Sequence, residues 1–206
     1  MGQFNPAIFQ PAWFTAQNLL RAAEADNANI DIIRPEICKF TADWVQLEVL
    51  QERFLASTIH TNMEEPLKDL VLGTFRILHH TPVQQLEITK EMHIKLDTED
   101  AWHAIGNKLT PKTIWESIVK KPGMASLTIQ GERTDNRTGA FLVKVEPSRR
   151  PEFHPAIFFQ ITDRVQFPVA EKAPSLGCEK VMDVLTEIWP SSLRRAKECV
   201  SKLMNA

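Results

Sequence analysis

The stretch from Trp44 to Leu96 constrains the fold more than any other part of the chain, because its hydrophobic period changes twice along it. Val45, Leu47 and Val49 alternate with polar residues, which is the pattern of a strand with one buried face. Apolar residues then recur at the three- and four-residue spacing of an amphipathic helix, and extended alternation returns at the end. The predicted elements are a strand over 44–58, a helix over 63–80 and a strand over 83–96.

The rest of the chain predicts further helices and strands. Proline in a first turn favours a helix, whereas proline within an extended run marks an edge or a bulge. The predicted elements are an apolar arm over 4–10, helices over 11–25, 98–106 and 110–121, a strand over 30–40 interrupted at Pro35, a hairpin around 124–145, a strand over 154–167, and a C-terminal helix from Ser175 that breaks or kinks at Pro190.

This order of elements predicts an α+β fold, with mainly antiparallel sheets and amphipathic helices packed on one face. A chain of 206 residues with 43% apolar residues can close one substantial core. We therefore expect a single domain over 1–206. The alternative is a subdivision into 1–96 and 124–206, joined by a helical insert over 97–123.

Charge and cysteine content exclude several classes of protein. Lys and Arg number 24 against 26 Asp and Glu, so no overall field favours nucleic acid or an anionic surface. The three cysteines, an odd number at wide spacing, suit neither a disulfide framework nor a zinc site, and they favour a reducing compartment.

No apolar run approaches the roughly 18 residues of a membrane span. We expect a cytoplasmic protein without a membrane partner.

Several segments of the chain form a recognisable series. They are the strand Asp43-Trp44-Val45-Gln46-Leu47-Glu48, the segment Arg53-Phe54-Leu55-Ala56-Ser57-Thr58, the acidic helix and strand that follow, and Asp183-Val184-Leu185 near the C-terminus. In these segments the chain resembles a sporadically distributed family of bacterial proteins that has no established activity. Where the family ends its strand in R-Y-x-N, this chain has Glu87-Ile88-Thr89-Lys90. The resemblance implies an α+β fold and a bacterial origin, and it implies no site.

Histidines and acidic pairs give no clear catalytic or metal site. Adjacent His79 and His80 on a helix point about 100° apart, and His93 and His103 stand at no helical ligand spacing, so we expect no metal and no cofactor. The acidic pairs occur at predicted helix starts, where the helix dipole already accounts for them. These carboxylates are Glu64, Glu65, Asp97, Glu99 and Asp100.

Cys178 is the candidate nucleophile, because a thiol near a helix start can have a lowered pKa. It would need a histidine base such as His154 or His103 close in space. Cys38 and Cys199 sit in apolar patterns typical of core residues. We expect no catalytic residue.

Basic residues around the predicted hairpin leave nucleic-acid binding as an option that the net charge does not favour. They are Arg133, Arg137, Lys144, Arg149 and Arg150.

Three features predict surfaces for binding other proteins. Trp102 and Trp115 lie on the short inserted helices, and tryptophan is enriched at interfaces. Ile157 and Phe159 belong to a strand that is apolar on both faces, and Leu193 and Leu203 to the stripe of the broken C-terminal helix.

The leading interpretation is a non-enzymatic bacterial protein that binds a protein partner or forms a homo-oligomer, with an accessory role in a defence or toxin-control system as one expectation. The alternatives are a small-molecule binder or hydrolase, with a pocket between the sheet and the inserted helices, and a nucleic-acid-binding module.

Overall fold

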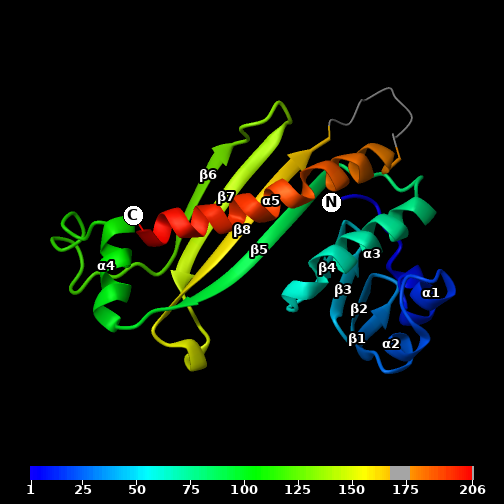
Figure 1. The fold of residues 1–206 in the computed structure, drawn as a ribbon, viewed down its shortest axis with the longest axis horizontal. Coiled ribbons are helices and arrows are strands. Elements are labelled where there is room, and N and C mark those ends of the chain that lie inside the picture. The colour runs from blue at the N-terminus through cyan, green and yellow to red at the C-terminus, as the bar shows by residue number, and fades with distance from the viewer. Residues whose placement is uncertain (168–176, 206) are drawn as a thin grey trace. The chain divides into compact units, whose positions relative to one another are not determined.

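The computed structural model describes residues 1–167 and 177–205 of the chain. They divide into two compact units, and each unit is described by itself. Unit 1 comprises Met1–Leu86 with Gln166–Trp189, and unit 2 comprises Glu87–Val165 with Pro190–Ala206. Both units combine an antiparallel four-stranded sheet with helices, so the predicted α+β fold is confirmed (Figure 1).

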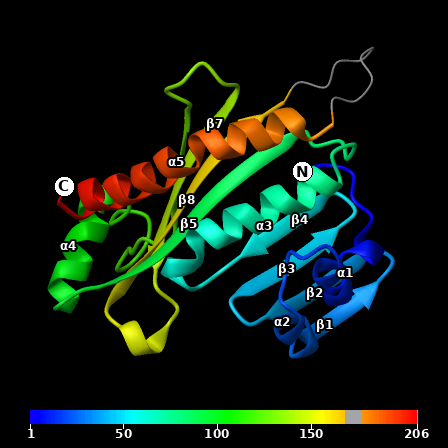
Figure 2. The same ribbon diagram turned by 45° about the vertical axis from the view of Figure 1, so that its right-hand side comes forward.

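Unit 1 is built around a sheet with the strand order β1-β2-β3-β4. Its elements are η1 (Pro6–Ile8), α1 (Pro11–Ala16), α2 (Ala22–Asp26), β1 (Asn29–Arg34), β2 (Ile37–Ala42), β3 (Val45–Leu50), β4 (Arg53–Ser57), η2 (Thr61–Met63) and α3 (Glu64–Ile77). Figure 2 shows α3 running alongside β4.

Each of the first two predicted strands is in fact a hairpin. The predicted strand over 30–40 is β1 and β2, with Pro35 in the turn, where its missing N–H costs no ladder hydrogen bond. The predicted strand over 44–58 is β3 and β4, which meet at a turn over Gln51 and Glu52. These two residues carry no Gly, Pro, Asn or Asp turn signal, which is why the sequence pattern missed the reversal.

The predicted helix over 11–25 is also interrupted. Asn18 has a φ of 57°, a left-handed conformation that asparagine tolerates better than most residues. The chain therefore turns between α1 and α2 and does not continue as one helix.

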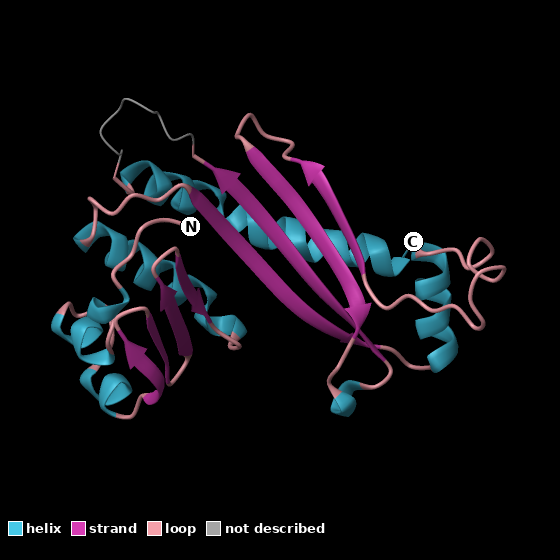
Figure 3. Ribbon diagram, turned by 180° about the vertical axis from the view of Figure 1, so that it is seen from behind, coloured by secondary structure: helices cyan, strands magenta, loops and turns pink. Residues whose placement is uncertain are grey.

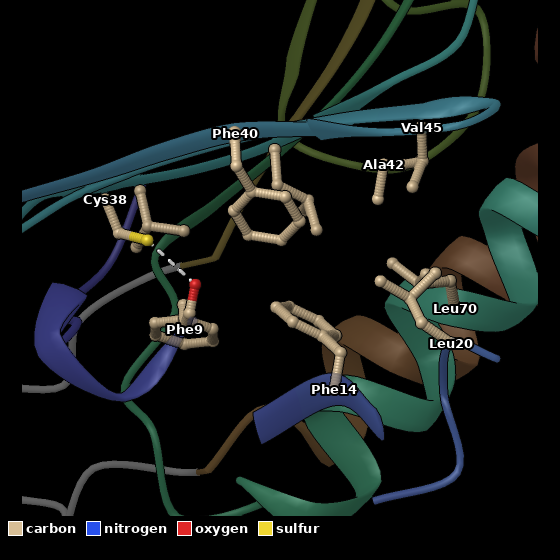
Figure 4. Packing of buried hydrophobic residues seen from close by; sticks show 10 residues of the cluster. Phe9, Phe14, Leu20, Cys38, Phe40, Ala42, Val45 and Leu70 are labelled. Carbon is tan, nitrogen blue, oxygen red and sulfur yellow. Dashed lines mark hydrogen bonds between the residues drawn. The ribbon is translucent and has the colours of Figure 1, made fainter. Parts of the chain in front are cut away.

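The core of unit 1 holds the arm, the sheet and α3 together. Phe9, Phe14 and Phe40 are fully buried and stack edge-on or tilted, and Cys38 Sγ donates to the carbonyl of Phe9 at 2.8 Å (Figure 4). Leu70 of α3 reaches the same cluster. The predicted helix over 63–80 is thus confirmed in α3, and it buries the predicted stripe.

Unit 2 has the sheet order β5-β8-β7-β6. Its elements are β5 (Gln85–Lys95), α4 (Glu99–Leu109), β6 (Leu127–Glu132), β7 (Gly139–Pro147), η3 (Pro151–Phe153), β8 (Ala156–Gln166) and the C-terminal part of α5 (Glu179–Asn205). The boundary between the units falls within β5, β8 and α5. The predicted hairpin is confirmed as β6 and β7. Figure 3 shows the helix lying against one face of this sheet.

Strand β8 shows why an apolar run on both faces need not be an interface. Ile157, Phe159 and Ile161 point into the core against Ala196 and Val200 of α5. On the other face, the ring of Phe158 lies 4.9 Å from that of His93. Both apolar faces therefore have contacts within unit 2.

The C-terminal helix is not broken at Pro190. Helix α5 runs without interruption from Glu179 to Asn205, with Pro190 in its interior. The predicted start at Ser175 lies outside the described residues. No helix within 1–167 or 177–205 is both long and apolar enough to span a bilayer.

Candidate protein-binding surface

The segment over 111–121 projects apolar side chains into solvent. Two consecutive turns shape it: the N–H of Trp115 donates to the carbonyl of Lys112 at 2.8 Å, and the N–H of Val119 donates to the carbonyl of Trp115 at 2.8 Å. These turns place four apolar residues at one- and three-residue intervals. The exposed fractions are 71% for Ile114, 47% for Trp115, 67% for Ile118 and 47% for Val119. We call these four side chains the Trp115 surface.

The predicted helix over 110–121 does not form. The segment is assigned as turns, bounded by Pro111 and by Pro122 with Gly123. Four β-branched residues, Thr113, Ile114, Ile118 and Val119, lower its helix propensity. No packed face compensates, because the apolar residues remain exposed.

Lysines flank the Trp115 surface in the sequence. Lys108, Lys112, Lys120 and Lys121 have no carboxylate within ion-pair distance in the part of the chain that the structure describes, and Glu116 is the acidic residue among them. An apolar patch with an unneutralised basic rim is complementary to an apolar patch with an acidic rim.

A pocket of about 250 Å³ lies between α4 and the end of α5. Its lining includes Ile105, Lys108, Leu109, Leu203 and Met204. It is smaller than the roughly 300–1,000 Å³ of most sites for drug-sized ligands. The pocket suits a single inserted side chain better than a metabolite.

The six predicted binding residues have different environments. Trp115 is exposed and Leu203 lines the pocket. Trp102 and Leu193 are half-buried, and Trp102 packs in the core of unit 2. Ile157 and Phe159 are 2% and 0% exposed, so neither side chain is available to a partner in the described fold.

A buried ion cluster that the sequence analysis did not anticipate joins three elements of unit 2. Arg133, whose side chain is 1% exposed, donates to Asp163 of β8 and, through Nε and Nη2, to both carboxylate oxygens of Asp135 at 2.8 Å. Arg137 Nη1 donates to Asp135 at 2.9 Å. The paired Arg133 guanidinium, followed by Arg137, holds the pKa of Asp135 well below its usual range.

Gly139 and Arg195 lie beside this ion cluster and have fixed positions. Gly139, with a φ of 149°, begins β7 where a Cβ would meet the carbonyl of Arg164 at 2.0 Å, so only glycine lets the chain pass. Arg195 of α5 lies 5.4 Å from the centroid of Phe141 and 3.8 Å from Asp163. Every charge in the cluster faces an opposite charge, which indicates a structural role.

The same pairing affects the proposed basic face. Arg133 and Arg137 are neutralised by Asp135 and Asp163, and Lys144 Nζ lies 2.6 Å from Glu146. Because these three side chains already pair with carboxylates, they do not form a basic face for the phosphates of a nucleic acid.

A serine and a histidine do meet in unit 2, but without the rest of a catalytic triad. His93 Nδ1 lies 2.9 Å from Ser148 Oγ, which also accepts from the N–H of Arg150 at 3.2 Å. Burial, followed by the charge of Arg150, lowers the pKa of His93. In the described residues no carboxylate hydrogen-bonds to His93, so nothing orients the imidazole as a triad acid would.

Cys178 lies in a different environment from the one expected of a nucleophile. It is fully buried, its Sγ donates to the carbonyl of Phe75 at 3.2 Å, and burial raises its pKa. Within 1–167 and 177–205 no group of three or more His, Cys, Asp or Glu side chains is arranged to hold a metal ion.

Sequence reasoning missed Ile114, Ile118, Val119 and the flanking lysines as binding residues. Their spacing is the same as that of a stripe that packs on a sheet, so the pattern could not show that this one stays exposed. Comparison with protein-family models, with curated proteins and with solved structures finds no match.

Proposed function

We propose that the protein is a non-enzymatic protein-interaction component that binds another protein through the Trp115 surface. The observation that carries this proposal is the exposure of Ile114, Trp115, Ile118 and Val119 together on one short segment. Contiguous exposed apolar residues mark interaction sites on soluble proteins, and tryptophan is among the residues that contribute most at interfaces.

The four lysines around this surface determine the character of the partner. An acidic rim on the partner would speed association and fix its orientation, while the apolar contact would supply most of the affinity. The resemblance to a sporadically distributed bacterial family supports a bacterial, cytoplasmic setting, in which the protein would be an accessory of a defence or toxin-control system.

The test compares capture of partners by three forms of the full chain from the native host. The Trp115→Ser variant changes the candidate surface, and the Ile59→Ser variant is the matched control, because Ile59 is 87% exposed in unit 1. A partner retained by wild type and Ile59→Ser, and lost by Trp115→Ser, supports the proposal. The purified partner should then bind Trp115→Ser at least about tenfold more weakly, a loss of about 1.4 kcal/mol.

Equal capture of every partner by all three forms contradicts the proposal. Binding should also weaken with added salt and in the Lys112→Glu variant, because both reduce the attraction to an acidic rim. Salt-independent binding would be consistent with the apolar contact, but it would contradict the proposed acidic rim on the partner.

The alternative function is a small-molecule binder, which would use the pocket between α4 and α5. Its lining is apolar apart from Lys108 and Asn205, which suits a small apolar group with an anionic end. Native mass spectrometry of the purified protein decides between the two functions, because a retained ligand lost from a Leu203→Trp variant would place it in this pocket.

A further inference from the structure

Strand β6 has an exposed edge. It pairs antiparallel with β7 on one side, and no other strand of the described chain pairs with it (Figures 1 and 3). All its residues after Leu127 are exposed. The N–H and C=O groups that point away from β7 are therefore available to another strand.

This edge lacks the features that usually prevent pairing between chains. Such edges normally carry lysine, proline, a bulge or inward-facing charges. The opposite edge of the sheet, β5, carries Glu87, Lys90, Glu91 and Lys95, and the edge strand β1 of unit 1 has a register shift between Ile30 and Ile32. In β6 the sequence is Leu-Thr-Ile-Gln-Gly-Glu, which is charged only at Glu132.

The apolar face of the sheet extends to this edge without cover. Ile129 pairs with Val143, and Val143 pairs with the buried Ile161, so all three side chains point to the face on which α5 packs. Ile129 is nevertheless 58% exposed. On the same face, a Cβ built on Gly131 would meet no atom within 4 Å.

We infer that a second copy of the chain adds its β6 to this edge, antiparallel, with Gln130 opposite Gln130 of the second copy. In this register each Ile129 lies opposite Gly131 of the other copy, so the exposed side chain occupies the open space above the glycine. The two isoleucines then approach each other diagonally across the symmetry axis. The edge is self-complementary in shape, as a two-fold interface requires.

Charge agrees with this register. On the other face of the sheet, Glu132 lies opposite Thr128 of the second copy, and Thr128 pairs with Lys144 in β7. The carboxylate therefore approaches Lys144, whose ammonium also pairs with Glu146, and does not lie opposite Glu132 of the second copy. The flanking lysines of the Trp115 surface would instead repel their own copies, which is why we assign self-association to β6 and hetero-partner binding to the Trp115 surface.

This inference goes beyond the proposed function, since dimerisation through β6 and partner binding through the Trp115 surface are separable. Light scattering of the full chain should show a mass that rises toward twice the monomer mass of 23.5 kDa as the concentration increases from about 1 to about 100 µM. The Ile129→Lys variant should remain monomeric over this range. The matched Ile30→Lys variant should dimerise like wild type, because Ile30 is a 52% exposed isoleucine on the edge strand β1.

A wild-type protein that stays monomeric overturns the inference, and so does equal dimerisation of Ile129→Lys and Ile30→Lys. Circular dichroism confirms that both variants fold. The Trp115→Ser variant should still dimerise, so a failure of the proposed function leaves this measurement unaffected.

Cross-linking tests the register. Residues directly opposite in an antiparallel pair have Cα atoms about 4.5–5.5 Å apart, within the range for a disulfide. In a Cys199→Ser background, which leaves the buried Cys38 and Cys178, Gln130→Cys should form a disulfide-linked dimer under mild oxidation. Thr128→Cys should not, because the two introduced residues would be offset by about 13 Å along the strands. Efficient cross-linking of Thr128→Cys without Gln130→Cys overturns the register and the Ile129–Gly131 contact with it.

Discussion

Ser192 donates a 2.6 Å hydrogen bond from Oγ to Oδ2 of Asp163, and thereby ties α5 to β8 two residues after Pro190. The other carboxylate oxygen of Asp163 accepts from Arg133, which follows β6. One buried carboxylate thus joins the helix, the central strand and the β6–β7 connection. Because α5 is continuous at this point, the Ser192 side chain bonds to the sheet and does not cap a helix end.

Replacing Asp163 should destabilise the protein more than replacing Ser192. The Asp163→Asn variant leaves Arg133 as a buried cation with one carboxylate fewer, which costs about 3–5 kcal/mol. The Ser192→Ala variant loses one hydrogen bond to a charged group, about 1.5–3 kcal/mol. Urea unfolding measures both, with Asp69→Asn as the control, because the Asp69 side chain is 72% exposed. If Asp163→Asn lowers the free energy of unfolding no more than this control does, the ion cluster contributes little to stability.

Asp135 should make stability depend on pH below about 4. Its pKa in the folded protein is lowered chiefly by Arg133, whereas an unfolded aspartate titrates near 3.9. A depressed pKa gives stability that is complete above the unfolded pKa and is lost as pH falls toward the folded one. The free-energy difference between wild type and Asp135→Asn, measured by urea unfolding, should therefore be larger at pH 7 than at pH 3. The same difference at both pH values would contradict this assignment.

Helix α3 gives the sharpest test of unit 1. Leu70 is 4% exposed in the core, so Leu70→Asp buries a charge or pulls the helix off its sheet, at a cost of several kcal/mol. Glu64, in the first turn, contributes a dipole interaction of about 0.3–1 kcal/mol, so Glu64→Gln should melt close to wild type. Thermal melts of the two variants measure the contrast. A near-wild-type melt for Leu70→Asp would show that the stripe does not face the core.

The fold class and the buried face of α3 could be predicted from the sequence, because the spacing of apolar residues differs between helices and strands. The hairpin turn at Gln51 and Glu52 could not, since no residue there favours reversal, and the register of the neighbouring strands enforces it. At Pro190 the sequence predicted an interruption that the structure does not have. A helix interior disfavours proline, yet contacts of α5 on both sides of Pro190 keep the helix continuous.

The candidate surface was only partly predictable for a related reason. Trp115 was singled out by residue type, but an amphipathic stripe has the same spacing whether it packs or stays exposed. Ile157 and Phe159 show the converse, because the helix that covers them comes from more than 30 residues further along the chain. Only the assembled structure separates a covered apolar face from an open one.

The three cysteines should react with a thiol reagent in an order set by burial. Burial raises the pKa of all three thiols, but Cys38 and Cys178 are fully buried whereas Cys199 is partly exposed and near Lys202, whose charge opposes the rise. The thiolate is the reactive form, so at neutral pH Cys199 should be labelled first, and Cys38 and Cys178 only at the rate at which the fold opens. Peptide mapping after timed labelling gives the three rates, and a Cys199→Ser variant should lose the fast phase. Selective rapid labelling of Cys178 would instead show that its buried environment opens readily, and it would strengthen the case for an enzyme.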